Sequence, residues 1–244
     1  MRLRGAATCP VEPDSRAFAD AALAVLRADR WSPGGWARFA DRVARRSAQQ
    51  AAAHPRAVAE LTALHAGFAL ASRGRGPWWI VISWLMAVTH LGLLGDRRSI
   101  GWPNVISLVR ANLPVTGEPL GRWVGVAAVV SDQLDGTLAR RTGPTMFGFY
   151  ADSLADAAFW TWLGFRHEPS RWLRLATLAA WAAPVVAVTA TSLGKGKMID
   201  SPRPMRLRPA AAMQIVLAVH TLTRPTVRSR HSLGTQERRE KPTG

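Results

Sequence analysis

The strongest constraint on the fold is the distribution of apolar residues, which changes near residue 77. Beyond that point, apolar runs alternate with short basic stretches. Some runs reach the roughly 20 residues that an upright helix needs to cross a bilayer, and tryptophans gather near their ends as in interfacial belts. The runs cover residues 78–95, 104–116, 120–135, 145–165, 172–193 and 209–223. We predict an all-α fold, a polytopic membrane bundle of about five to six membrane helices.

Residues 1–76 have a different character, because they are polar and rich in Ala and Arg. Ser32 and Pro33 predict the N-cap and the first residue of a helix. Apolar residues then recur at helical spacing from Trp36 to Ala44, with arginines on the other face. Such a helix can lie on an anionic lipid surface or pack on its own neighbours. The expected organisation is a helical, partly amphipathic extension over 1–76, a membrane domain over 77–223 and a basic disordered tail over 224–244.

The net charge limits the choice of partners. Lys and Arg number 32 against 16 Asp and Glu, a formal net charge of +16, which suits nucleic acid, an anionic membrane face or phosphorylated substrates. Because the basic residues lie in loops beside apolar runs, we expect membrane lipids as partners and no nucleic acid. Cys9 is the single cysteine, which rules out an internal disulfide and a multi-cysteine zinc site. Residues 5–16 lack the apolar core of a signal peptide, so secretion is not expected.

Four aspartates lie where membrane helices should be apolar. Asp132 and Asp135 end one apolar run, and Asp152 and Asp156 lie inside the next. Each costs roughly 2.5–3.5 kcal/mol to insert into a membrane, so such residues are functional candidates by default. The spacing of three and four residues places each pair on one face of a helix.

A Gly-Pro step at 143–144 should reverse the chain between the two pairs and form an antiparallel helical hairpin. Counting outward from this turn, Asp135 and Asp152 fall at one height along the helices. Asp132 and Asp156 fall at another, because each residue rises by the same 1.5 Å. The sequence therefore predicts that the four carboxylates converge.

Converging carboxylates need cations, because like charges raise one another's pKa and oppose ionisation. A ligand set made only of oxygen atoms favours Mg²⁺, Mn²⁺ or Ca²⁺ over zinc. The alternative is that the acids line a solvated loop or form buried salt bridges with Arg110, Arg140 or Arg141.

The same residues form a motif that resembles the signature of CDP-alcohol phosphatidyltransferases. It reads Asp132-x2-Asp135-Gly136-x2-Ala139-Arg140, followed by Gly148-x3-Asp152-x3-Asp156. The spacer between its halves is residues 141–147, one residue shorter than is usual in that family. Upstream, residues 104–110 resemble the family's Asn-x2-Thr-x2-Arg segment, with Ser107 in place of Thr. The resemblance extends over about residues 100–223, and the expected source is a bacterial, actinobacterial-type member. The abundance of Arg, Ala and Trp is typical of a GC-rich bacterial genome.

The resemblance implies a metal-dependent enzyme of phospholipid biosynthesis. It would transfer a phosphoalcohol group, expected to be phosphatidyl, from a CDP-linked donor to an acceptor alcohol and release CMP. The expected donor is CDP-diacylglycerol, and the expected cofactor is Mg²⁺ or Mn²⁺. The expected location is the bacterial plasma membrane, which the chain crosses several times with its site facing the cytoplasm, and a homodimer is compatible with the family.

The resemblance also assigns roles to residues. The metal ligands would be Asp132, Asp135, Asp152 and Asp156, and Asp156 would also take the proton of the attacking hydroxyl. The CDP site would comprise Asp132, Gly136, Ala139, Arg140, Gly148 and Ser107. An acceptor phosphate would meet a basic segment that contains Lys195, Lys197 and Arg206, although the same charges can act as a topological signal.

Two competing functions use similar chemistry. Intramembrane prenyltransferases hold Mg²⁺-diphosphate with aspartate-rich motifs, but they normally have two separated motifs on more helices than this chain can supply. A divalent-cation carrier or a non-catalytic homologue is the other alternative. Against the latter, every acid of the motif is present.

Overall fold

The computed structural model describes residues 13–199 and 207–223, and every regular element in these ranges is helical. The prediction of an all-α fold is therefore confirmed, while the predicted tail at 224–244 lies outside the described residues. The elements are α1 Pro13–Ala28, α2 Pro33–Ala53, α3 Pro55–Ser72, α4 Pro77–Thr89, η1 Leu91–Leu94, α5 Gly101–Thr116, η2 Glu118–Trp123, α6 Val124–Thr142, α7 Met146–His167, α8 Arg171–Lys195 and α9 Leu207–Thr223.

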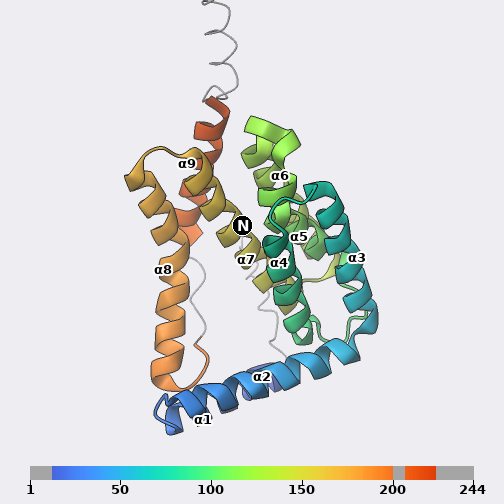
Figure 1. The fold of residues 1–244 in the computed structure, drawn as a ribbon, viewed down its shortest axis with the longest axis vertical. Coiled ribbons are helices and arrows are strands. Elements are labelled where there is room, and N and C mark those ends of the chain that lie inside the picture. The colour runs from blue at the N-terminus through green and yellow to red at the C-terminus, as the bar shows by residue number, and fades with distance from the viewer. Residues whose placement is uncertain (1–12, 200–206, 224–244) are drawn as a thin grey trace, which may run out of the picture.

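Helices α3 to α9 form a bundle, and α2 runs crosswise over one of its ends with α1 beside it (Figure 1). At the centre, α5 packs against both α6 and α7. Gly148 of α7 lies directly against α5, because an added Cβ there would collide with the side chain of Asn104. Glycine is thus needed for this helix contact.

Three apolar clusters hold the bundle together, and two of them contain residues of α7. The first joins four helices through Leu61 of α3, Ala87 of α4, Leu108 of α5 and Phe147 of α7. The second includes buried Phe159, Trp160 and Leu163 of α7, which pack with α5, α6 and α9. Since α7 contributes to both clusters, its position is fixed from either side.

Helix α2 begins where the sequence predicts. The Ser32 hydroxyl accepts a hydrogen bond of 3.0 Å from the N–H of Gly35, and Pro33 opens the helix. Two residues of the apolar stripe, Trp36 and Val43, remain 43% and 36% exposed. This leaves part of the apolar stripe uncovered, as an interfacial helix requires, and the lipid contact itself stays a prediction.

Helix α3 joins the same bundle. The Glu60 carboxylate accepts hydrogen bonds from the Ser99 hydroxyl at 2.8 Å and from the N–H of Ile100 at 2.9 Å, immediately before α5 begins. The sequence placed α3 in the N-terminal extension, yet it shares a core with α4 and α5. The boundary near residue 76 stays a prediction.

By length and apolar composition, α8 is the one described helix that qualifies as a membrane span; α4 and residues 212–223 are shorter apolar helices. The helices α5 and α6 carry ionisable and amide side chains, which lower their hydropathy. Some of those side chains form the candidate site together with two aspartates of α7.

Candidate metal and nucleotide site

A turn at the predicted Gly-Pro step joins α6 to α7 in a hairpin whose two helices pack on α5 rather than tightly on each other. Gly143 has a φ of +87°, a conformation that a side chain would strain. Thr145 caps the start of α7 by accepting a backbone N–H of its first turn. Arg97 donates to the carbonyls of Thr142 and Gly143, at 3.1 and 2.9 Å, and so satisfies the end of α6.

Three aspartates converge about 10–15 Å from this hairpin, judged by the helical rise. Asp132, Asp152 and Asp156 each offer one carboxylate oxygen, and these oxygens lie within 4.8 Å of one another. The side chain of Asp156 is 13% exposed, whereas that of Asp152 is 41% exposed. The group is therefore buried on one side and accessible on the other.

Asp135 lies against α5 and outside that group of three. Its side chain is 6% exposed, and its Oδ2 accepts hydrogen bonds from the Ser107 hydroxyl at 2.8 Å and from Nη1 of Arg110 at 3.0 Å. The sequence predicted four converging ligands. The structure brings three of them together and connects the fourth through Arg110.

The side chain of Arg110 lies among all four acids and is 0% exposed. Besides its bond to Asp135, its Nε lies 2.8 Å from Oδ1 of Asp156. Its Nη2 contacts Asp152 and lies 3.5 Å from Oδ1 of Asp132. When every acid is ionised, one guanidinium neutralises one of four negative charges, so the site still attracts cations.

From the sequence, the four aspartates could either form salt bridges or bind a metal. In the structure, Arg110 forms the salt bridges. Two buried atoms of this group nevertheless lack a hydrogen bond. Nε of Arg110 and Oδ1 of Asp156 are close, but they are not aligned for a hydrogen bond. Both atoms are buried without a hydrogen-bond partner. Together with the neighbouring carboxylates of Asp132 and Asp152, this oxygen of Asp156 fits a divalent cation with oxygen ligands.

Two residues of the site were not predicted as members. Arg110 appeared in the sequence only as a motif position and a salt-bridge alternative. Gln214 of α9 donates a hydrogen bond of 3.0 Å from Nε2 to Oδ2 of Asp156. The sequence could have indicated this residue, because Gln214 is the one amide side chain in the apolar run at 209–223.

The residues predicted to bind CDP divide into two sets. Gly136, Ala139 and Arg140 follow the acids along α6, where Arg140 is exposed and donates to the Thr137 hydroxyl at 3.0 Å. A Cβ on Gly136 would lie 3.4 Å from Nη1 of Arg140. Ser107 and Gly148, by contrast, are engaged in contacts with Asp135 and with α5. The nucleotide contacts of all these residues stay predictions.

The predicted acceptor residues lie at the far end of α8. Lys195 and Lys197 are exposed, and the carbonyl of Lys195 accepts a hydrogen bond of 3.0 Å from Arg27 of α1. Arg206 lies outside the described residues. Their contact with an acceptor phosphate stays a prediction.

The sequence model of the family described as CDP-alcohol phosphatidyltransferase matches residues 99–230, more than half of the 244-residue chain. The match includes the hairpin and all four aspartates, and it begins after α4. Searches of curated proteins and of solved structures found no match.

Proposed function

Because the chain belongs to the CDP-alcohol phosphatidyltransferase family, we propose that it transfers a phosphatidyl group from CDP-diacylglycerol to an acceptor alcohol in phospholipid biosynthesis. Membership makes the chain a membrane enzyme that transfers a substituted phosphate group. It favours this function over the prenyltransferase alternative. The observation that carries the finer proposal is the group of three carboxylate oxygens within 4.8 Å, one residue of which has a buried oxygen without a hydrogen bond.

In this proposal Asp132, Asp152 and Asp156 hold a divalent metal, and Asp135 lies beside them. The oxygen-only donor set favours Mg²⁺ or Mn²⁺. When bound, such an ion neutralises the diphosphate of the donor and the charge that develops at the transferred phosphorus.

The transfer itself exchanges one phosphorus–oxygen bond for another. The acceptor hydroxyl oxygen bonds to the phosphorus that carries the lipid alcohol, and the anhydride bond to CMP breaks, with its electron pair leaving on CMP. The hydroxyl proton passes to Asp156. Gln214 supports this role because it holds Oδ2 of Asp156 and thereby fixes the orientation of the carboxylate.

The remaining residues of the proposal bind substrates. The small side chains of Gly136 and Ala139 let the nucleotide approach the backbone of α6 closely. Arg140 offers paired hydrogen-bond donors to the phosphates of the nucleotide. Lys195 and Lys197 would orient an anionic acceptor. The hairpin end of the bundle carries Arg97 in addition to the arginines of α6, which supports a cytoplasmic orientation by the positive-inside rule.

The test is a reconstituted assay with CDP-diacylglycerol and a panel of alcohols, in which CMP and the lipid product are both measured. Activity should vanish when divalent ions are chelated and return with Mg²⁺ or Mn²⁺. Asp152→Asn should be inactive, whereas Asp96→Asn, which changes an exposed loop acid, should retain activity. Equal activity of the two variants, or CMP release without a lipid product, would contradict the proposal.

A further inference from the structure

Helix α8 ends in an ordered turn that carries two lysines. Gly196 has a φ of +64°. Its N–H donates to the carbonyl of Leu193 at 3.1 Å, and the N–H of Lys197 donates to that of Ser192 at 3.2 Å. This is a Schellman motif, which ends the helix at the glycine. The side chains of Lys195 and Lys197 are exposed, and neither ammonium group has a hydrogen-bond or ion-pair partner among the described residues.

Helix α1 binds the backbone of this turn at three points. Nη1 of Arg27 donates to the carbonyl of Lys195 at 3.0 Å. Nη2 of Arg16 donates to the carbonyl of Met198 at 3.2 Å. The N–H of Met198 donates to Oδ1 of Asp20 at 2.6 Å. Since all three bonds use backbone atoms of the turn, they leave its lysine side chains exposed.

Helix α8 has little other support at this end. It is almost entirely exposed within the chain. The residues that it contributes to an apolar cluster, Leu173 and Trp181, lie in its first half, whereas its C-terminal end meets α1 (Figure 1). A helix end with few tertiary contacts frays easily. The bonds from α1 therefore help to fix the position of Lys195 and Lys197.

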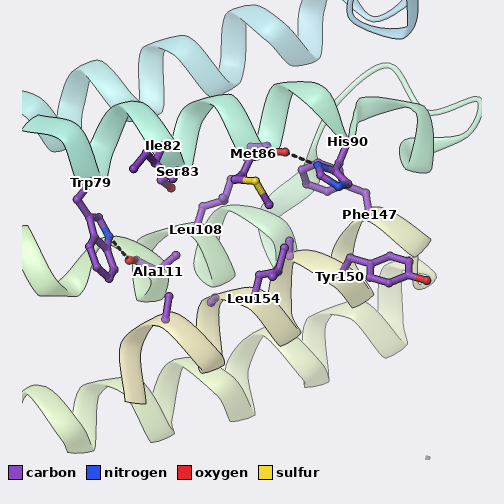
Figure 2. A pocket seen from close by; sticks show the side chains of 14 residues that line it. Trp79, Ile82, Ser83, Met86, His90, Leu108, Ala111, Phe147, Tyr150 and Leu154 are labelled. Carbon is purple, nitrogen blue, oxygen red and sulfur yellow. Dashed lines mark hydrogen bonds between the residues drawn. The ribbon is translucent and has the colours of Figure 1, made fainter. Parts of the chain in front are cut away.

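Helix α1 is itself connected to the bundle through α2, on which it packs. The Ser47 hydroxyl of α2 donates to the carbonyl of Thr89, the last residue of α4, at 3.0 Å. The ring of His90, next in the chain, donates from Nδ1 to the carbonyl of Met86 at 2.7 Å (Figure 2). The end of α4 is thus an ordered attachment point, and the turn after α8 is linked to it through α1 and α2.

The hairpin between α6 and α7 lies at the same end of the bundle. Phe147, in the first turn of α7, belongs to one apolar cluster with Leu91 and Leu94 of η1. The same short helix also packs on α2. The two lysines and the hairpin are therefore at one end of the molecule.

We propose that α1 is a positioning element for the acceptor, because it holds the backbone after α8 so that Lys195 and Lys197 together bind the phosphate of a phosphorylated alcohol. This role rests on the proposed function, in which the two lysines orient an anionic acceptor. Cations on a fixed backbone lose less entropy when they bind an anion. Asp20 is the positioning residue, since it accepts the N–H of Met198, directly after Lys197. Helix α1 precedes residue 99 and so lies outside the family match.

Replacement of Asp20 separates positioning from simple electrostatics. Its carboxylate is an anion bonded next to Lys197, so by charge alone its removal should favour an anionic acceptor. If it holds the backbone, its removal should weaken acceptor binding instead. Asp20→Asn keeps an oxygen that can accept the N–H of Met198, whereas Asp20→Ala does not. Asp41→Ala is the control, because it removes an exposed acid of α2 that pairs with Arg45.

The test uses the full chain in nanodiscs and measures three quantities: amide exchange of residues 195–199, equilibrium binding of inorganic phosphate, and the KM for a phosphorylated alcohol. Asp20→Ala should lose the exchange protection of this segment. It should raise the phosphate Kd and the acceptor KM about tenfold, as expected when one charge-assisted hydrogen bond is lost, with kcat and the donor KM unchanged. Asp20→Asn and Asp41→Ala should stay close to wild type.

Rapid exchange of residues 195–199 in the wild-type chain, which requires no variant, would overturn the proposal. An unchanged or lower phosphate Kd in Asp20→Ala would also overturn it, as would equal effects of Asp20→Ala and Asp20→Asn. A lower kcat or a higher donor KM in Asp20→Ala would indicate general loss of structure and count against it. Exchange and phosphate binding do not depend on turnover, so they judge this role even if no alcohol is a substrate. CMP release and lipid product judge the proposed function separately.

Discussion

Nε of Arg110 lies 2.8 Å from Oδ1 of Asp156, yet the two atoms do not form a hydrogen bond. The same guanidinium contacts three further carboxylates, which it cannot all neutralise. A buried group of this kind is stable only while its charges remain balanced. The consequences of this balance can be measured.

Replacing Arg110 with Met should lower the free energy of unfolding by about 3–5 kcal/mol, because it leaves buried carboxylates without their cation. Adding Asp135→Asn should recover part of that loss, since it removes one of the uncompensated charges. Chemical unfolding in detergent of both single variants and the double variant measures the coupling. Strictly additive effects would show that Arg110 does not balance Asp135.

Asp132→Asn should abolish both turnover and metal-dependent CDP binding, because it removes one of the three converging oxygens. Asp156→Asn should retain much of the CDP affinity and lose the chemical step, since its main proposed role is that of a base. Equilibrium CDP binding and single-turnover rates, measured on the same preparations, separate the two roles. If Asp156→Asn lost CDP binding as completely as Asp132→Asn, Asp156 would be chiefly a metal ligand.

Gln214→Leu should lower kcat about tenfold and leave the KM for the CDP donor nearly unchanged, as expected when one hydrogen bond that orients a base is lost. Steady-state kinetics with the donor varied provides the measurement. Ile215→Ala, an exposed neighbour on α9, is the control for changes in helix packing. A rise in KM with normal kcat would assign Gln214 to substrate binding instead.

Lys195→Ala should raise the KM for a phosphorylated acceptor by about one to two orders of magnitude, the effect of losing a charge-assisted hydrogen bond of roughly 1.5–3 kcal/mol. Donor affinity should not change. Arg166→Ala, which removes an exposed charge at the C-terminal end of α7, serves as the control. An unchanged acceptor KM would leave the segment after α8 a topological signal.

Glu60 predicts a pH dependence of stability. Burial raises the pKa of its carboxyl, but hydrogen bonds from Ile100, Ser99 and Arg56 outweigh it, so the pKa falls below its usual 4.5. Since folding favours the ionised form, its contribution is complete above pH 4.5 and is lost as the pH falls through the lowered pKa. Glu60→Gln should lower the unfolding free energy at pH 7 by about 1–3 kcal/mol and by less in acid. Unfolding curves at several pH values test this, and a constant difference at every pH would contradict it.

Much of the fold and part of the site could be predicted from local pattern. Hydrophobic runs located the helices α4 to α9, and the Gly-Pro step located the hairpin, because both depend on residues close in the sequence. The ion pairs between Arg110 and the four aspartates could not be predicted, since they depend on the rotation of α5 relative to α6 and α7. By charge alone, Arg110, Arg140 and Arg141 were equally possible partners of the aspartates. The hydrogen bond from Gln214 to Asp156 could not be predicted either, because it depends on how α9 packs against α7.

The contacts of α3 define the smallest piece of this chain that should fold. The family match begins at residue 99, but Leu61 belongs to the same core as Leu108 and Phe147, and Glu60 binds the backbone just ahead of α5. A fragment cut at the start of the match would expose an apolar face beside the catalytic helices. We therefore expect the segment that matches the family to be shorter than the segment that folds on its own.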